Sequence, residues 1–269
     1  MEQAKSKAKI SLIIPAYNEE KYIGACIDHA LKASAYAIAE AGKGKQQDQA
    51  SVAGSAADQE AGFCEIIIID NASTDGTRDV AERYPGVRVV HEASKGLVFA
   101  RQRGYKESVG DILAYVDADA QMPEGWLARV RSEFSKNDNL SCLSGPYIYY
   151  DISPFQQFIV RLYWWILGMP VYWIVGFMVT GSNFALKRSV VDQMNGFDTS
   201  IKFYGEDTDI ARRASKFGKV LFSSSFPMYT SGRRLKGQGL YYTGIIYIVN
   251  FLSEVLFHKP STSEYRDIR

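Results

Sequence analysis

Cysteine and net charge are both scarce in this sequence. The 269 residues include only Cys26, Cys64 and Cys142, and 31 basic residues against 30 acidic ones leave a formal charge of +1. The cysteines are far apart, odd in number and in no metal-ligand spacing, which indicates reduced thiols in a cytosolic compartment. A nearly neutral chain has no overall field to attract nucleic acid, so we expect no nucleic-acid partner.

Two sequence signals are also missing near the start of the chain. The basic lead of MEQAKSKAKISLIIP precedes an apolar run of only a few residues that ends at Pro15, which is too short for a signal peptide. No Gly-rich triphosphate-binding loop follows that run, where PAYNEE stands instead. This difference disfavours a sugar nucleotidyltransferase.

Strand and helix patterns alternate through the first half of the chain. Short β-branched runs lie within 9–18, 64–70, 87–93 and 110–120, and helical patterns within 18–42, 77–84 and 95–108. The alternation predicts an α/β fold with a mostly parallel sheet flanked by helices. Residues 43–62 are small and polar with almost nothing to bury, which predicts a disordered loop.

Polar residues stand where the predicted strands end. Asn18, Asp70, Asp117 and Asp119 follow apolar runs, and the carboxyl ends of parallel strands line the ligand crevice of such sheets. Asp70 could accept hydrogen bonds from a base N–H or a ribose hydroxyl. The residues after it, in the segment DNASTDGT, are typical of caps and turns.

Asp117 and Asp119 form a D-x-D pair whose side chains leave extended backbone on the same side. Magnesium and manganese take few protein carboxylates and complete their shell with phosphate oxygens and water. The pair therefore predicts a divalent cation site beside a diphosphate. The alternative is a pair of solvated turn carboxylates, with Asp119 capping a following helix.

Several blocks together resemble one known family. They are SLIIPAYNEEKYI, EIIIIDNASTDGT, KGLVFARQRGY, GDILAYVDADA, GSNFALKRSVV, NGFD and GEDTDIARRASKFG, in order from about residue 10 to 218. In order and spacing the chain resembles the family 2 glycosyltransferases, which have the Rossmann-like GT-A fold. We therefore expect a catalytic domain at 1–235, followed by an amphipathic, apolar helical tail at 236–269.

The resemblance implies a site for a nucleotide-sugar donor. Its residues, carried over by position, would be Pro15, Ala16, Tyr17, Glu19, Asp70, Lys95, Arg101 and Asp117. Asp119 would be the direct ligand of a divalent cation, Mn²⁺ or Mg²⁺, and Asp117 would touch both ribose and metal. Such a metal neutralises charge on the departing diphosphate. No downstream histidine stands at a spacing that convincingly completes the metal shell.

Two later motifs extend the implied site. The segment GEDTD at 205–209 resembles the family's Glu-Asp motif, in which Asp207, with Glu206 second, would take the proton of the acceptor hydroxyl. Attack from the face opposite the diphosphate implies inversion at the anomeric carbon. The alternative is a helix start that favours acids. Arg233 and Arg234 suit phosphate recognition, or form a basic surface turn.

Residues 162–179 form an uncharged stretch as long as a membrane span. Proline and glycine interrupt it, so we expect a helix before Pro170 and a strand after it rather than a span. Trp164, Trp165 and Tyr172 fit an acceptor wall, an interfacial patch or core packing.

The second apolar stretch, 240–257, repeats polar residues at helical spacing. Thr243, Tyr247, Asn250 and Glu254 would form one narrow polar stripe in a wide apolar surface. Cations on both flanks suit a helix in a membrane interface near anionic headgroups. A helix packed on the domain or on a second subunit is the rival interpretation.

These features favour an inverting, metal-dependent glycosyltransferase at the cytoplasmic face of a membrane. It would move a sugar from a nucleotide-diphosphate sugar, a UDP-sugar first, to a glycan or lipid-linked acceptor in envelope polysaccharide or glycolipid synthesis. A non-catalytic sugar-nucleotide or glycan-binding relative is disfavoured because both the D-x-D and the Glu-Asp carboxylates are present.

Overall fold

The computed structural model describes residues 8–43, 63–201 and 204–262. The disordered loop predicted at 43–62 lies outside these residues, apart from Lys43 at the end of a helix.

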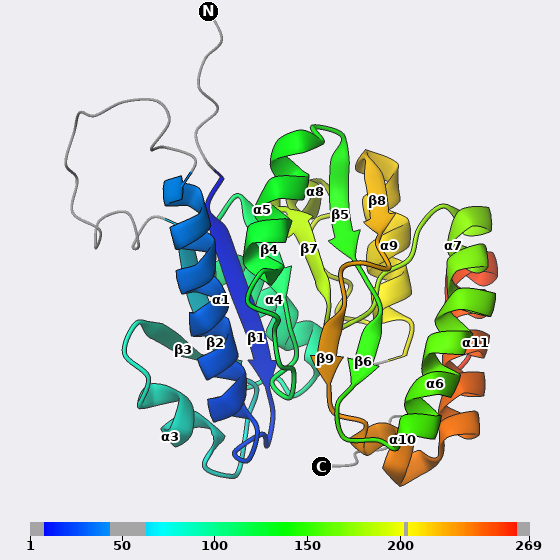
Figure 1. Cartoon of the computed structure of the whole chain (residues 1–269), viewed down its shortest axis with the longest axis horizontal. Helices are drawn as coiled ribbons and strands as arrows, with labels where there is room; N and C mark the ends of the chain where they lie inside the picture. Colours follow the sequence, from blue (N-terminus) through cyan, green and yellow to red (C-terminus); the bar gives the residue numbers. More distant parts are fainter. Residues whose placement is uncertain (1–7, 44–62, 202–203, 263–269) are drawn as a thin grey trace, which may run out of the picture.

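A seven-stranded, mostly parallel sheet forms the centre of the molecule, in the order β3-β2-β1-β4-β7-β5-β8 (Figure 1). Its strands are β1 (Ile10–Ala16), β2 (Cys64–Asp70), β3 (Val87–His91), β4 (Ile112–Tyr115), β5 (Leu140–Ser144), β7 (Phe184–Lys187) and β8 (Lys219–Phe222). Only β7 runs antiparallel to its neighbours, β4 and β5. The predicted α/β fold is confirmed.

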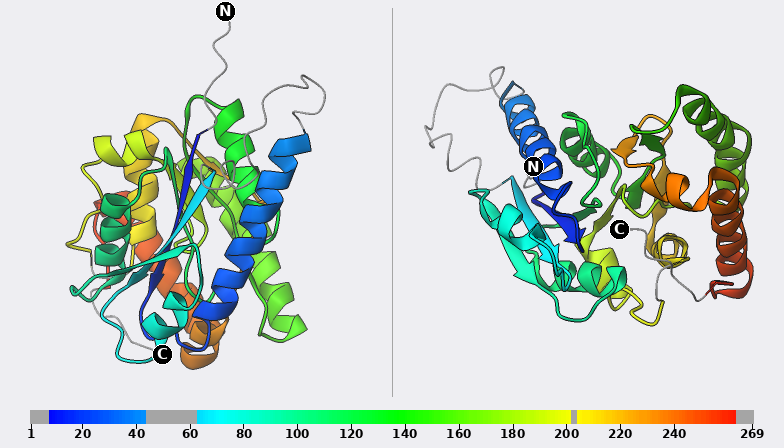
Figure 2. Two further views of the ribbon diagram at one scale, coloured as in Figure 1. Left: turned by 90° about the vertical axis from the view of Figure 1, so that its left-hand side faces the viewer. Right: turned by 90° about the horizontal axis from the view of Figure 1, so that it is seen from below.

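Helices cover both faces of the sheet (Figure 2). They are α1 (Ile23–Lys43), α3 (Thr77–Glu82), α4 (Leu97–Glu107), α5 (Trp126–Lys136), α8 (Arg188–Gln193) and α9 (Glu206–Ala214). Alternate residues of β1 supply two separate cores: Leu12 and Ile14 pack with α1 and α5, and Ile13 packs with α4, α8 and α9. Strands buried on both faces explain the near-continuous apolar runs.

Beyond the carboxyl edge of the large sheet, β6 (Tyr147–Tyr149) and β9 (Met228–Thr230) form a parallel pair. Gln121 bridges to Tyr229, and the hydroxyl of Tyr150 donates to the carbonyl of Asp119 at 3.2 Å. This small sheet therefore holds the segment that follows the D-x-D pair.

A continuous helical segment runs through Pro170, so the prediction of a helix before this residue and a strand after it is wrong. The segment consists of α6 (Pro154–Tyr163), a π-helical turn η1 (Trp164–Gly168) and α7 (Met169–Val175). A π-turn is wider than an α-turn, so it accommodates a proline that lacks an N–H and would otherwise crowd the preceding turn. The strand begins only at Phe184.

The predicted C-terminal helix is present as α11 (Leu240–Phe257), directly after the short α10 (Arg233–Gln238). In its polar stripe, Thr243, Asn250 and Glu254 are buried, while large apolar residues of the same helix are exposed. Figures 1 and 2 place α6, α7 and α11 at the same end of the molecule, on the right in Figure 1.

Gly145, between β5 and β6, allows a close backbone contact that positions the small sheet. A Cβ atom there would overlap the carbonyl oxygen of Phe226. We expect Gly145→Ala to lower the free energy of unfolding by about 1–3 kcal/mol, the usual range for overpacking. Gly42→Ala is the matched control: its Cβ would lie in open space on α1, so it should raise stability by about 0.5–1 kcal/mol. Urea denaturation measures both, and equal stability of the two variants would contradict the tight contact.

Candidate functional site

Parallel strands bring most of the predicted donor residues to one edge of the sheet. Pro15 and Ala16 end β1 and are buried, and Ala16 lies opposite Asp70 in the β1–β2 register. On the other side of β1, β4 runs parallel and leads directly to Asp117 and Asp119. The three carboxyl ends therefore open in the same direction.

The β1–α1 loop is tied to the loop after β2. Asn18 Oδ1 accepts a hydrogen bond from the backbone N–H of Thr74 at 2.8 Å, and the N–H of Glu19 donates to the hydroxyl of Thr77 at 2.7 Å. Asp75 Oδ1 accepts from the N–H of Thr77 at 3.0 Å. The cap and turn residues thus have the structural role that their types indicate, and they hold the site loops in place.

Asp70 is buried at the end of β2 and contacts a residue that the sequence analysis missed. Its Oδ1 accepts from the N–H of Ser73 at 3.3 Å, and its Oδ2 lies 3.0 Å from Nδ1 of His91. His91 ends β3 opposite Asp70 in the strand register. The strand-end rule that selected Asp70 could also have identified this histidine.

Tyr17 and Lys95, both predicted at the donor site, meet across the loops. Lys95 Nζ donates to the Tyr17 hydroxyl at 2.6 Å and lies 4.0 Å from the centre of its ring. The pair forms a cationic, aromatic wall beside Asp70. A wall of this kind suits a nucleotide base and its phosphates.

Arg233 joins the D-x-D motif to the β1–α1 loop. Its Nη2 lies 3.0 Å from Oδ2 of Asp119, and its Nη1 donates to Oε2 of Glu19 at 2.8 Å. Oδ1 of Asp119 accepts from the hydroxyl of Thr230 at 3.2 Å. Glu19 and Asp119 are both buried, so this guanidinium compensates two carboxylates at once.

The helix-cap alternative for Asp119 is wrong, because α5 begins at Trp126 with Gly125 as its N-cap. The carboxylate of Asp119 faces Arg233 and Thr230 instead. Among the described residues, no three His, Cys, Asp or Glu side chains gather as a complete metal shell. The donor set fits a Mg²⁺ or Mn²⁺ ion that takes one or two carboxylates and completes its shell with phosphate and water. The guanidinium at Asp119 marks where positive charge is stabilised.

The Glu-Asp motif begins α9, where its acids lie in different environments. Glu206 is buried, with Oε1 3.2 Å from Nη1 of Arg101, and Arg101 Nη2 also donates to the carbonyl of Gly181 at 2.6 Å. Burial first, and then the charge of Asp207, raises the pKa of Glu206. Burial likewise raises the pKa of Asp207, which remains partly accessible.

The third acid of the motif, Asp209, has a structural role. It is buried and pairs with Arg212 at 2.6 Å and with Arg213 at 3.3 Å. Because its carboxylate is turned toward these two arginines, it is not available to an acceptor. The helix-start interpretation therefore suits Asp209 and leaves Asp207 as the accessible acid.

Tyrosines that the sequence analysis missed stand between the two acidic motifs. Tyr147 on β6 accepts a hydrogen bond from the N–H of Ser182 at 2.7 Å. Burial, then the charges of Asp117 and Asp207, raise the pKa of Tyr147, which places its hydroxyl near both motifs.

Two further tyrosines come from the helices at the end of the molecule. Tyr163 on α6 and Tyr247 on α11 lie within electrostatic range of Asp207. Arg234, half-buried on α10, lies within the same range of Tyr149 and Tyr247. The space beside Asp207 is therefore walled by tyrosines and one arginine.

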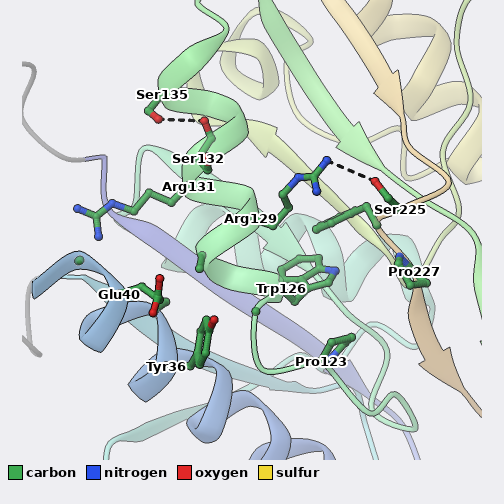
Figure 3. Close-up of a pocket in the computed structure, with 15 residues that line it drawn as sticks. Tyr36, Glu40, Pro123, Trp126, Arg129, Arg131, Ser132, Ser135, Ser225 and Pro227 are labelled. Atoms are coloured by element: carbon green, nitrogen blue, oxygen red, sulfur yellow. Dashed lines mark hydrogen bonds between the residues drawn. The ribbon is translucent and has the colours of Figure 1, made fainter. Parts of the chain in front are cut away.

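A separate cavity of about 710 Å³ lies between α1 and α5 (Figure 3). Tyr36 and Glu40 line it from α1, and Trp126 and Arg129 line it from α5. It contains none of the predicted donor, metal or catalytic residues. The strand-end site, and not this cavity, is therefore the candidate active site.

The comparisons with known proteins agree on one family. A model of glycosyl transferase family 2 matches residues 51–194. The probable glycosyltransferase YdaM of Bacillus subtilis is 25% identical over 231 residues, which cover 81% of this chain and 49% of that protein. The uncharacterized glycosyltransferase YibD of Escherichia coli is 31% identical over 121 residues, covering 44% and 28%. The chain thus spans half or less of the length of these relatives.

Solved structures share the fold. A mannosyltransferase from Pyrobaculum calidifontis, in complex with GDP-Man and Mn²⁺, has a TM-score of 0.60 at 18% identity, with 94% of this chain and 64% of that chain covered. TarS of S. aureus, in complex with UDP-GlcNAc, has a TM-score of 0.57 at 17% identity, with 83% and 58% covered. These likenesses confirm the GT-A fold. Since the family model covers more than half of the residues, the chain belongs to glycosyl transferase family 2.

Proposed function

We propose that the protein transfers a sugar from a nucleotide-diphosphate sugar, a UDP-sugar first, to a hydroxyl of a glycan or lipid-linked acceptor, with inversion at the anomeric carbon. The observation that carries this proposal is the position of Tyr147, whose hydroxyl feels the charges of both Asp117 and Asp207. A donor held by the D-x-D motif would present its sugar to the Glu-Asp motif across one shared space. The reaction belongs to cytoplasmic synthesis of envelope polysaccharide or glycolipid.

The donor side rests on the strand ends. Pro15, Ala16 and Asp70 would contact the base and ribose, and the Tyr17–Lys95 pair lies at the rim of the same edge. Related structures that contain GDP-Man or UDP-GlcNAc support a nucleotide-sugar donor. Asp119, with Asp117, would hold a divalent cation, and a structure with Mn²⁺ supports that assignment.

When bound, such an ion supplies Lewis-acid stabilisation of the charge on the leaving diphosphate. Arg233 would contribute to the same purpose. It now pairs with Asp119, and release from this carboxylate would make its fork available to phosphate oxygens. Arg234 lies next to it on α10.

The acceptor side rests on the different environments of the two acids. Glu206 is held by Arg101, which suits a positioning role for both, in place of the phosphate contact expected for Arg101. Asp207 is the accessible acid with a raised pKa. It would take the proton of the acceptor hydroxyl as the oxygen bonds to the anomeric carbon. The bond from that carbon to the diphosphate oxygen breaks on the opposite face.

A donor panel tests the proposal. The protein is incubated with UDP- and GDP-sugars and Mn²⁺, with and without lipid-linked acceptors, and release of UDP or GDP is measured. Release that depends on acceptor supports transfer. Donor binding without release from any donor would instead support a non-catalytic sugar-nucleotide-binding relative.

Asp119→Ala should reduce transfer at least about 100-fold, because a Lewis-acid contribution of several kcal/mol depends on this ligand. Binding of Mn²⁺ together with UDP, measured by calorimetry, should weaken in parallel. Asp192→Ala is the matched control, since Asp192 is exposed on α8. Full transfer in excess chelator, or by the Asp119→Ala variant, would refute the metal role.

Arg233→Met should lower the free energy of unfolding by about 3 kcal/mol without metal, because it leaves the buried carboxylates of Glu19 and Asp119 uncompensated. Added Mn²⁺ should restore stability more in the variant than in the wild type. Lys236→Met removes an exposed ion pair to Asp151 and should cost about 0–1 kcal/mol. Thermal melts with and without Mn²⁺ measure both. A variant as stable as the wild type and indifferent to Mn²⁺ would show that Arg233 does not occupy the cation position.

Asp207→Asn should lower kcat by about 10² to 10⁴ and leave donor binding nearly unchanged, because the side chain acts on the acceptor. The base must be ionised and its pKa is raised, so wild-type kcat/KM should begin to fall, as the pH is lowered, above the ordinary aspartate value of about 3.9. This acidic limb should disappear from the residual activity of the variant. Loss of donor binding in Asp207→Asn would show that the residue belongs to the donor site.

A further inference from the structure

The outer surfaces of α6–η1–α7 (residues 154–175) and α11 (residues 240–257) form an apolar edge at one end of the molecule (Figures 1 and 2). Both helical segments are long and apolar enough to cross a membrane, yet only 6% and 17% of their residues are buried in the protein. Trp165 and Ile174 are 78% and 84% exposed on the first, and Tyr241 and Phe257 are 78% and 72% exposed on the second. Apolar patches of this extent mark interaction surfaces.

The orientation of α11 is the reverse of that in a water-exposed amphipathic helix. Its polar stripe faces the domain: Glu254 Oε1 lies 3.3 Å from Arg212, and Asn250 Oδ1 accepts from the N–H of Thr262 at 3.0 Å. Its apolar side faces outward. A helix that turns its polar residues inward matches an environment outside the protein that is less polar than the surface it covers.

Neither segment can be surrounded by lipid, because each is attached to the domain along its inner side. Trp164 stacks on Phe222 of β8 with ring centres 5.3 Å apart, and the Tyr172 hydroxyl donates to the carbonyl of Val220 at 3.2 Å. The polar stripe holds α11 in the same way. The attachment excludes a transmembrane span and is consistent with a surface that lies on a membrane.

The charges around the apolar edge are complementary to an anionic surface. Residues 154–175 contain one charged residue, the exposed Arg161, and residues 240–257 contain only Glu254, which is buried. The apolar edge thus presents no exposed carboxylate of its own helices, and the exposed Lys236 and Lys259 flank α11. A subunit interface would usually carry charges of both signs at its rim, whereas cations around an apolar, aromatic surface suit lipid headgroups.

We propose that the apolar edge docks on the surface of an anionic lipid bilayer, with α6–η1–α7 and α11 in the interfacial layer. The exposed tryptophans and tyrosines suit the headgroup region, where one end of the ring is apolar and the other wet. The interpretation of α11 alone as the membrane element thereby extends to two helical segments that share one face.

The same two segments supply Tyr163 and Tyr247, which lie near Asp207. Resting on the proposed function, this arrangement puts the acceptor space directly behind the membrane face. An acceptor carried on a lipid would then enter between α6 and α11 without leaving the bilayer surface. The structure thus favours the lipid-linked class over a soluble glycan.

Flotation with vesicles tests the docking surface in the full chain. We expect the protein to float with vesicles of phosphatidylglycerol and phosphatidylcholine, and less with phosphatidylcholine alone. Ile174→Glu and Ile245→Glu should each weaken binding about tenfold or more, since each puts a charge on the apolar face. Val109→Glu is the matched control, because Val109 is 65% exposed outside the apolar edge. Wild-type protein that stays in the soluble fraction, or Glu variants that float equally well, would overturn the proposal.

Two measurements separate other outcomes. Brominated lipids should quench the fluorescence of the wild-type protein through Trp165 and Trp173, and absence of quenching would overturn the proposal without any variant. A lipid-free dimer in light scattering that Ile245→Glu converts to a monomer, with no flotation, would overturn it in favour of an interface between copies. Vesicle binding needs no donor or metal, so failed sugar transfer leaves this test intact.

Discussion

The ion pairs of Arg233 with Glu19 and Asp119 are the interaction on which the arrangement of the site depends. Parallel strands deliver several carboxylates to one edge of the sheet, where like charges in a poorly solvated space repel one another. One guanidinium offsets two of them. Because Arg233 begins α10, and α10 leads directly into α11, the same interaction connects the strand-end site to the helix of the apolar edge.

Partners, rather than residue type, distinguish the acids at the start of α9. Glu206 is buried against Arg101, Asp209 is held by two arginines, and Asp207 alone remains accessible. The helix dipole favours all three acids and cannot by itself separate them. Their separation comes from the neighbouring elements, and it leaves the acid beside the tyrosine-walled space as the one able to meet a second substrate.

Local patterns were sufficient for much of the fold and part of the site. Isoleucine-rich runs ending in Asp70 or in the D-x-D pair indicated parallel strands with polar carboxyl ends, and β1, β2 and β4 place these residues at one edge. His91 follows the same rule and could have been found with them. The path through Pro170 could not, since a wider π-turn that tolerates proline leaves no sequence signal as simple as the residue that usually ends a helix.

The sequence by itself therefore determined the α/β alternation, the strand-end carboxylates and the existence of a polar stripe in 240–257, because each depends on neighbours within a few residues. Only the tertiary structure decided which partners these groups meet. The pair of Arg233 and Glu19 joins residues 214 positions apart, and the Tyr147 hydroxyl lies near two motifs from different halves of the chain. The stripe carried no information about which side of the helix would meet the domain. Docking against α9 turned it inward and left the apolar side exposed.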